Sequence, residues 1–82
     1  DGIDASQLSL ISLYPNPAKN SVSIKNAENY TISVYSIVGQ IVKQSLVKTN
    51  LYTMDISELP SGIYIMSFQY GDKKFNYRLT KQ

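Results

Sequence analysis

The sequence predicts an all-β protein, a seven-stranded antiparallel β-sandwich in a single domain of 82 residues. Short runs of alternating apolar and polar residues are separated by turn signals roughly every eight to twelve residues, which is typical of strands in a sandwich. No segment keeps the i, i+3, i+4, i+7 spacing of an amphipathic helix for long. These two observations together favour paired strands throughout the chain.

The segment from Ser57 to Gln82 is the clearest of these patterns, because it predicts a β-hairpin. Gly71-Asp72 separates two β-rich runs, and a glycine–polar pair supplies the positive φ that a type II′ turn needs. A corner with Pro60 and Gly62 precedes the first run, and we expect a positive φ at Gly62. The alternating apolar side chains should form one wall of the core: Tyr64, Met66, Phe68, Tyr70, Phe75, Tyr77 and Leu79.

Five further strands are predicted over residues 8–13, 21–25, 30–35, 40–47 and 51–56, the fourth with an ambiguous phase. Tyr14-Pro15-Asn16-Pro17 should form a rigid bend at a sheet edge, because proline cannot donate to a ladder. Gly39 should turn the chain with a backbone conformation that β-branched residues avoid. The expected core includes Leu10, Val22, Ile24, Ile32, Val34, Ile56, Tyr64, Met66, Phe68 and Tyr77.

Composition argues against several functions. The net charge of +2 is small and its basic residues are dispersed, which does not indicate nucleic-acid binding. No apolar run approaches the ~20 residues of a membrane span. Asp1-Gly2-Ile3-Asp4 is polar and does not resemble a signal peptide, so the chain is interpreted as a fragment that begins in a linker.

Catalysis and metal binding are also poorly supported. The chain has no histidine and no cysteine, which removes the usual general base and the easiest nucleophile. Asp55 and Glu58 are close in sequence, as paired carboxylates of glycosidases can be, but Asp55 and Ser57 are expected to hydrogen-bond the turn backbone before Pro60. The acids lack the spacing of a calcium loop. We therefore expect no enzyme, no metal and no cofactor.

Seven tyrosines leave a carbohydrate-binding module as one alternative function. Tyr35 and Tyr52 could point outward and form a platform for sugars, although strand tyrosines more often place their rings in the core and their hydroxyls in water. A structural Ig-like spacer of a surface protein is the other alternative.

Four blocks of the sequence resemble a known family. Tyr14-Pro15-Asn16-Pro17, then Ile32 to Val42, then Asp55 to Ile65, and finally Arg78-Leu79-Thr80-Lys81-Gln82 occur in the order found in type A C-terminal sorting domains of the type IX (Por) secretion system. The matches cover residues 8–82. Thr80 departs from the pattern, since the family usually has an aliphatic residue there.

The resemblance implies an Ig-like sandwich that serves as a secretion signal. Residues 8–82 would be the sorting domain and residues 1–7 a linker near the cleavage site. The implied partners are the outer-membrane translocon with its shuttle and sortase proteins, and an N-terminal cargo. The cargo would cross the periplasm to the cell surface, where a sortase removes the domain and commonly joins the cargo to an anionic lipopolysaccharide. A dimer through an edge strand is a further expectation.

The resemblance also assigns roles to residues. Recognition by the translocon would involve Arg78, Leu79, Thr80, Lys81 and Gln82, with Arg78 and Lys81 as exposed charges that contribute little to folding. Structural roles in the family motifs would fall to Pro15, Asn16, Pro17, Gly39, Asp55, Leu59, Gly62 and Tyr64.

Overall fold

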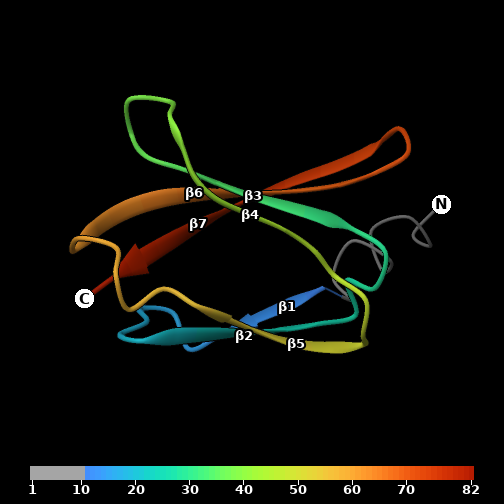
Figure 1. Ribbon diagram of the computed structural model, residues 1–82, viewed down its shortest axis with the longest axis horizontal. Helices are drawn as coiled ribbons and strands as arrows, with labels where there is room; N and C mark the ends of the chain where they lie inside the picture. Colours follow the sequence, from blue (N-terminus) through green and yellow to red (C-terminus); the bar gives the residue numbers. More distant parts are fainter. Residues whose placement is uncertain (1–10) are drawn as a thin grey trace, which may run out of the picture.

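Residues 11–82, which the computed structural model describes, form a sandwich of two antiparallel sheets (Figure 1). One sheet has the strand order β1-β2-β5, with β1 at Ser12–Tyr14, β2 at Ser21–Lys25 and β5 at Leu51–Asp55. The other has the order β4-β3-β6-β7, with β3 at Thr31–Tyr35, β4 at Ile41–Leu46, β6 at Gly62–Tyr70 and β7 at Lys73–Lys81. The predicted seven-stranded Ig-like sandwich is confirmed.

The core lies between the two sheets and contains the residues expected from the strand phases. Val22, Ile24, Ile32, Val34, Ile56, Tyr64, Met66 and Phe68 are all buried. Tyr77 is partly buried and packs its ring edge-on against Phe68, with centroids 5.2 Å apart. Leu10, the other predicted core residue, lies outside the described residues. Val47, Met54 and Leu79 complete the set of large, fully buried side chains.

The β6–β7 hairpin has the predicted turn but extends past the core. Gly71 has a φ of 62° and Asp72 is not among the residues with positive φ, which agrees with a type II′ turn. The tip of this hairpin projects beyond the other sheet (Figure 1). Tyr70, expected in the core wall, is therefore half exposed, and its ring packs instead against Tyr30 at a centroid distance of 5.4 Å.

A β-bulge explains why the phase of β4 is ambiguous in the sequence. Val34 pairs with Lys43 while Tyr35 pairs with Ile41, so that Val42 is an extra residue on β4. As a result, Lys43 and Ser45 face the space between the sheets, whereas Ile41 and Leu46 are exposed. A strict alternation of apolar residues is therefore absent from this edge strand.

Candidate recognition site

Residues 16–18, which follow β1, lie side by side with the C-terminal end of β7, along the free edge of that strand. The backbone N–H of Ala18 donates to the carbonyl of Thr80 at 2.8 Å, and the N–H of Gln82 donates to the carbonyl of Ala18 at 2.7 Å. Ala18 and Lys81 consequently form a parallel β-bridge. We call the residues Asn16–Ala18 together with Arg78–Gln82 the paired edge.

Asn16 extends this pairing with its side chain. Its Nδ2 donates to the carbonyl of Arg78 at 2.9 Å, and its Oδ1 accepts from the N–H of Thr80 at 3.1 Å. A carboxamide carries one donor group and one acceptor, as a peptide unit does, so Asn16 substitutes for a strand residue between prolines. The peptide bonds Tyr14–Pro15 and Asn16–Pro17 are both cis. The predicted bend at a sheet edge is confirmed, and the edge is that of β7.

The five C-terminal residues differ in their exposure, because alternate residues of β7 face opposite sides of the sheet. Arg78 and Gln82 are exposed and Thr80 is partly buried. Leu79 is fully buried, and Lys81 is only 9 % exposed, with its Nζ donating to the carbonyl of Gln82 at 3.2 Å. The expectation that Lys81 is an exposed charge is wrong, since Lys81 lies on the same face as Leu79.

A tyrosine corner forms the entry to β6. The hydroxyl of Tyr64 donates to the carbonyl of Pro60, four residues earlier, at 2.6 Å. In Ig-like sandwiches a tyrosine at the start of this strand makes such a bond to the backbone upstream. Leu59 is buried beneath the corner and its N–H donates to the carbonyl of Ile56. Gly62, at the start of β6, has the expected positive φ, 152°.

Gly39 closes the β3–β4 hairpin. The N–H of Gly39 donates to the carbonyl of Ser36 at 2.9 Å, and the φ of Gly39 is 89°. The N–H of Ser36 donates to the carbonyl of Gln40 at 2.8 Å. This is a three-residue loop in which a turn is followed by a residue in the left-handed region. The prediction for Gly39 is confirmed.

A family model for the secretion system C-terminal sorting domain matches residues 12–82. The chain belongs to this family of sorting domains. The sorting domain is 24 % identical over 75 residues to an ulvan lyase of Nonlabens ulvanivorans, a match that covers 88 % of this chain and 14 % of the lyase.

A solved structure gives the same fold. It comes from a study of PorZ, described as an essential surface component of the type IX secretion system of Porphyromonas gingivalis. The TM-score is 0.80 at 19 % identity, and the match covers 95 % of the sorting domain and 12 % of that chain. The sorting domain thus spans a small part of both relatives. It is a type IX C-terminal sorting signal, which implies export to the cell surface or the extracellular space.

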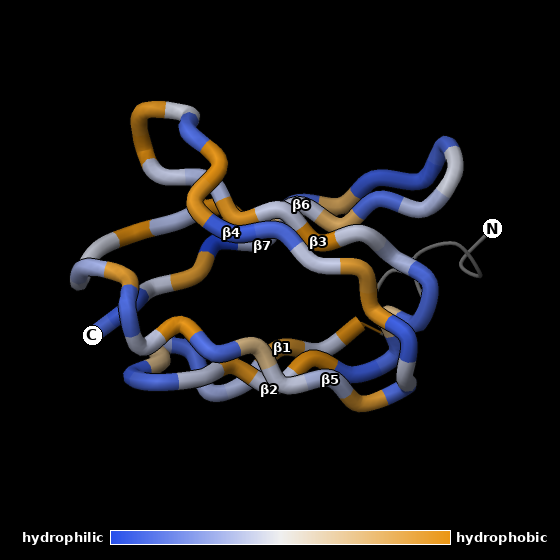
Figure 2. The backbone as a smooth tube through the Cα atoms, in the orientation of Figure 1, coloured by the Kyte–Doolittle hydropathy of each residue, from blue (hydrophilic) through white to orange (hydrophobic). Residues whose placement is uncertain are grey.

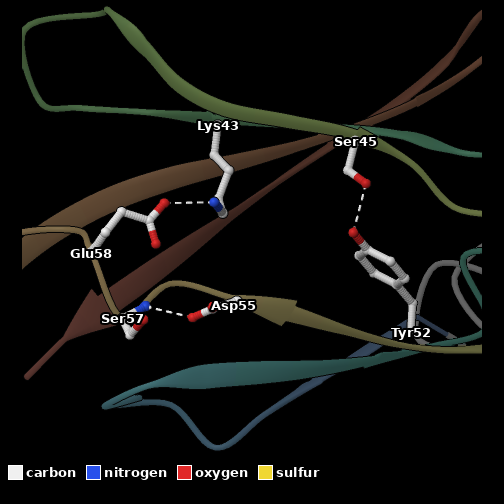
Figure 3. Close-up of polar contacts among 6 residues, drawn as sticks. All are labelled: Lys43, Ser45, Tyr52, Asp55, Ser57 and Glu58. Atoms are coloured by element: carbon white, nitrogen blue, oxygen red, sulfur yellow. Dashed lines mark hydrogen bonds and ion pairs between the residues drawn. The ribbon is translucent and has the colours of Figure 1, made fainter.

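Polar contacts join the two sheets of the sorting domain along the β4 flank (Figure 3). Lys43 on β4 forms an ion pair of 2.6 Å with Glu58, in the connection from β5 to β6. The same hydrogen bond from Lys43 holds the pKa of the Glu58 carboxyl below its ordinary value. The sequence did not indicate that Lys43 and Glu58 form a pair, because the bulge that turns Lys43 inward has no local signal.

Asp55 and Tyr52 both have structural partners. The N–H of Ser57 donates to Oδ1 of Asp55 at 2.9 Å, as expected for a turn, and this bond lowers the pKa of Asp55 (Figure 3). Tyr52 shares a hydrogen bond of 2.6 Å between its hydroxyl and that of Ser45 in the opposite sheet, and its ring packs against the core. Tyr35 belongs to the other sheet, so the alternative of a sugar platform formed by Tyr35 and Tyr52 is not supported.

The described residues hold no cluster of three or more His, Cys, Asp or Glu side chains that could bind a metal ion. Within residues 11–82 there is also no helix long and apolar enough to cross a membrane. The hydrogen bonds described above stabilise the turns and the paired edge.

Proposed function

We propose that the outer-membrane type IX translocon recognises the folded paired edge of this sorting domain, and that a surface sortase then cleaves the domain from its cargo. In this proposal the cargo lies N-terminal to residue 8, crosses the periplasm first, and is cut near residues 1–7. The shuttle and sortase proteins are the other partners.

One observation supports the paired edge as the surface that the translocon recognises. Asn16 in the first block of the family pattern, together with Ala18 directly after that block, makes four hydrogen bonds to the C-terminal block, far away in sequence. The C-terminal residues are therefore held in one conformation, and of these residues only Arg78 and Gln82 are exposed. A partner that read the tail as an unfolded peptide would first have to break these bonds.

The same contacts bear on self-association. A second copy that added a strand to β7 would compete with Asn16 and Ala18 for the same backbone groups. A dimer through an edge strand would therefore use another edge, which is β4 in that sheet or β1 or β5 in the other sheet.

The test is export of a reporter carrying a signal peptide and residues 1–82 in a host with type IX secretion. Arg78→Ala should leave the reporter in the periplasm, because it removes the exposed charge of the paired edge. Lys74→Ala is the matched control, since Lys74 is an exposed cation on the same face of β7. Melting curves should show both variants folded, because exposed charges contribute well under about 1 kcal/mol each.

Surface display of Arg78→Ala at the level of the Lys74→Ala control would show that recognition lies elsewhere. Failure of the unaltered chain to export the reporter would reject the sorting-signal function for this chain. A released reporter whose mass still includes the domain would reject only the part of the proposal that concerns cleavage by a sortase.

A further inference from the structure

The β3–β4 hairpin carries exposed apolar side chains that neither the core nor the turn requires. Ile37 and Val38 at its tip are 80 % and 76 % exposed. Turn positions favour Gly, Pro, Asn, Asp and Ser, whereas Ile and Val are strand residues with no role in this turn. Figure 2 shows the hairpin projecting from the sandwich with hydrophobic colour along much of its length.

The apolar surface continues from the hairpin onto the outer face of the sheet. Tyr35 on β3 pairs with Ile41 on β4 and with Ile65 on β6, which places these three side chains in one row on the outer face. Ile63, the next outward residue of β6, is also exposed. We call this surface the hairpin patch; its exposed aliphatic members are Ile37, Val38, Ile41, Ile63 and Ile65.

The hairpin patch adjoins the paired edge and ends at polar residues. On β7, Arg78 pairs with Ile65 and Thr80 pairs with Ile63, so the row runs directly into the proposed recognition residues. The neighbouring row on the outer face is polar and consists of Ser33, Gln44, Ser67 and Asn76, of which Gln44 and Asn76 are exposed and the two serines are buried. An apolar centre with a polar rim is the usual composition of a protein–protein interface.

The charge beside the hairpin patch distinguishes among the partners that could bind to it. No acidic residue occurs in residues 33–41, 63–67 or 76–80, so Arg78 is exposed beside the patch with no carboxylate on these strands. A second copy applied face to face would bring another Arg78 and no carboxylate. A membrane surface is normally bound by several clustered cations, whereas one arginine borders this patch.

We propose that the hairpin patch is the docking surface for a protein of the outer-membrane secretion machinery, one that offers apolar side chains to the hairpin and a carboxylate to Arg78. This inference rests on the proposed function and adds to it a second contact surface, formed by β3, β4, β6 and the loop between β3 and β4. Large exposed apolar patches on small soluble domains mark such interaction sites.

The experiment uses the same reporter fusion with residues 1–82. The double variant Ile37→Thr with Val38→Thr keeps β-branched side chains and removes apolar surface, so its melting temperature should match that of the unaltered chain. Surface display should fall by about tenfold or more, as when central interface residues are lost. The matched control is Leu46→Thr with Leu51→Thr, at the last residue of β4 and the first residue of β5. These residues are 50 % and 55 % exposed, and the control should display normally.

The outcomes separate the two proposals. If the unaltered fusion is not exported, the sorting function fails and the docking surface falls with it. If the unaltered fusion and the Ile37/Val38 variant are displayed equally, or if the Leu46/Leu51 control loses as much display, the docking surface alone is overturned.

A photo-reactive amino acid placed at Val38 in otherwise unaltered cells identifies the occupant. A cross-link to an identified outer-membrane component of the secretion system supports the proposal. A cross-link to a second copy of the domain, or recovery of the purified domain with floating anionic vesicles together with no protein adduct, overturns it.

Discussion

Single residues in this domain act mainly through backbone geometry and local hydrogen bonds. Gly62 has a φ of 152°, and an added Cβ there would meet no atom within 4 Å. The cost of a side chain at this position therefore comes from the backbone conformation, which only glycine adopts easily.

We expect Gly62→Val to lower the free energy of unfolding by about 1–3 kcal/mol, the usual cost of a side chain in such a backbone region. Ser61→Val is the matched control, because Ser61 is the exposed neighbour and is not among the residues with positive φ. Urea denaturation of the two variants measures the difference. Equal midpoints would mean that the corner relaxes without strain.

Tyr64 shows a second residue-level effect, because its ring is buried while its hydroxyl bonds to the carbonyl of Pro60. Tyr64→Phe keeps the packing and removes the hydrogen bond, and should cost about 1–2 kcal/mol. For a domain of this size each kcal/mol lowers the melting temperature by about 4–8 °C. Tyr70→Phe, which alters a half-exposed tyrosine, should melt close to the unaltered domain; a similar loss in both variants would contradict a specific role for the corner.

At the scale of elements, the contacts between strands decide which edges are closed. The paired edge covers the C-terminal part of β7, while Lys43–Glu58 and Ser45–Tyr52 join β4 to the β5 side of the sandwich. Edge strands commonly carry such features, since free backbone groups invite pairing with other chains. The C-terminal block is therefore displayed as an ordered surface.

The Lys43–Glu58 pair predicts a pH dependence with a definite sign. The pKa of Glu58 is lowered in the folded state, so in acid the unfolded chain binds its proton first and the contribution is lost as pH falls through the folded pKa. Glu58→Gln should therefore melt slightly below the unaltered domain at about pH 7, and the difference should shrink toward about pH 2. Glu58 is exposed, so the effect should be small.

The control for this pair is Glu28→Gln, which changes a glutamate in the β2–β3 connection. Calorimetry of both variants across the acid range gives the comparison. A melting difference for Glu58→Gln that stays constant with pH would show that the ion pair does not contribute through its charge.

At the scale of the whole molecule, one small core supports both sheets. Domains of about 80 residues bury little more than 60 % of their unfolded surface, and their stability is a few kcal/mol to about 12 kcal/mol. Phe68 on β6 is fully buried, and its ring packs against that of Tyr77. A single core substitution can therefore unfold the signal.

Phe68→Ala should cost about 3–5 kcal/mol and leave a large part of the molecules unfolded at 37 °C. Met66→Leu nearly conserves volume at the neighbouring core position and should cost less than about 1.5 kcal/mol. Thermal melting followed by circular dichroism compares the stability of the two variants. A Phe68→Ala domain that melts near the unaltered one would mean that the core can collapse around the cavity.

The sequence by itself determined most of the strands, the turns and most of the core. Val22, Ile24, Ile32 and Val34 were predicted to be buried from their alternation, and Gly39 was predicted to turn with positive φ; both depend on neighbouring residues alone. Such local patterns are readable because side-chain direction repeats every two residues along a strand. The order of four family blocks likewise indicated a sorting domain.

Only the tertiary structure decided that residues 16–18 pair with the C-terminal end of β7 and which side chains remain exposed. The bonds of Asn16 to Arg78 and Thr80 span more than 60 residues, and no local pattern specifies a partner at that distance. The burial of Lys81 follows from the face of β7 on which it lies, and the inward direction of Lys43 follows from a bulge. The residue types of Ile37 and Val38 do not indicate that their side chains are exposed. Their exposure follows from the hairpin, which projects from the sandwich, because burial is a property of the packed sheets and not of the residue type.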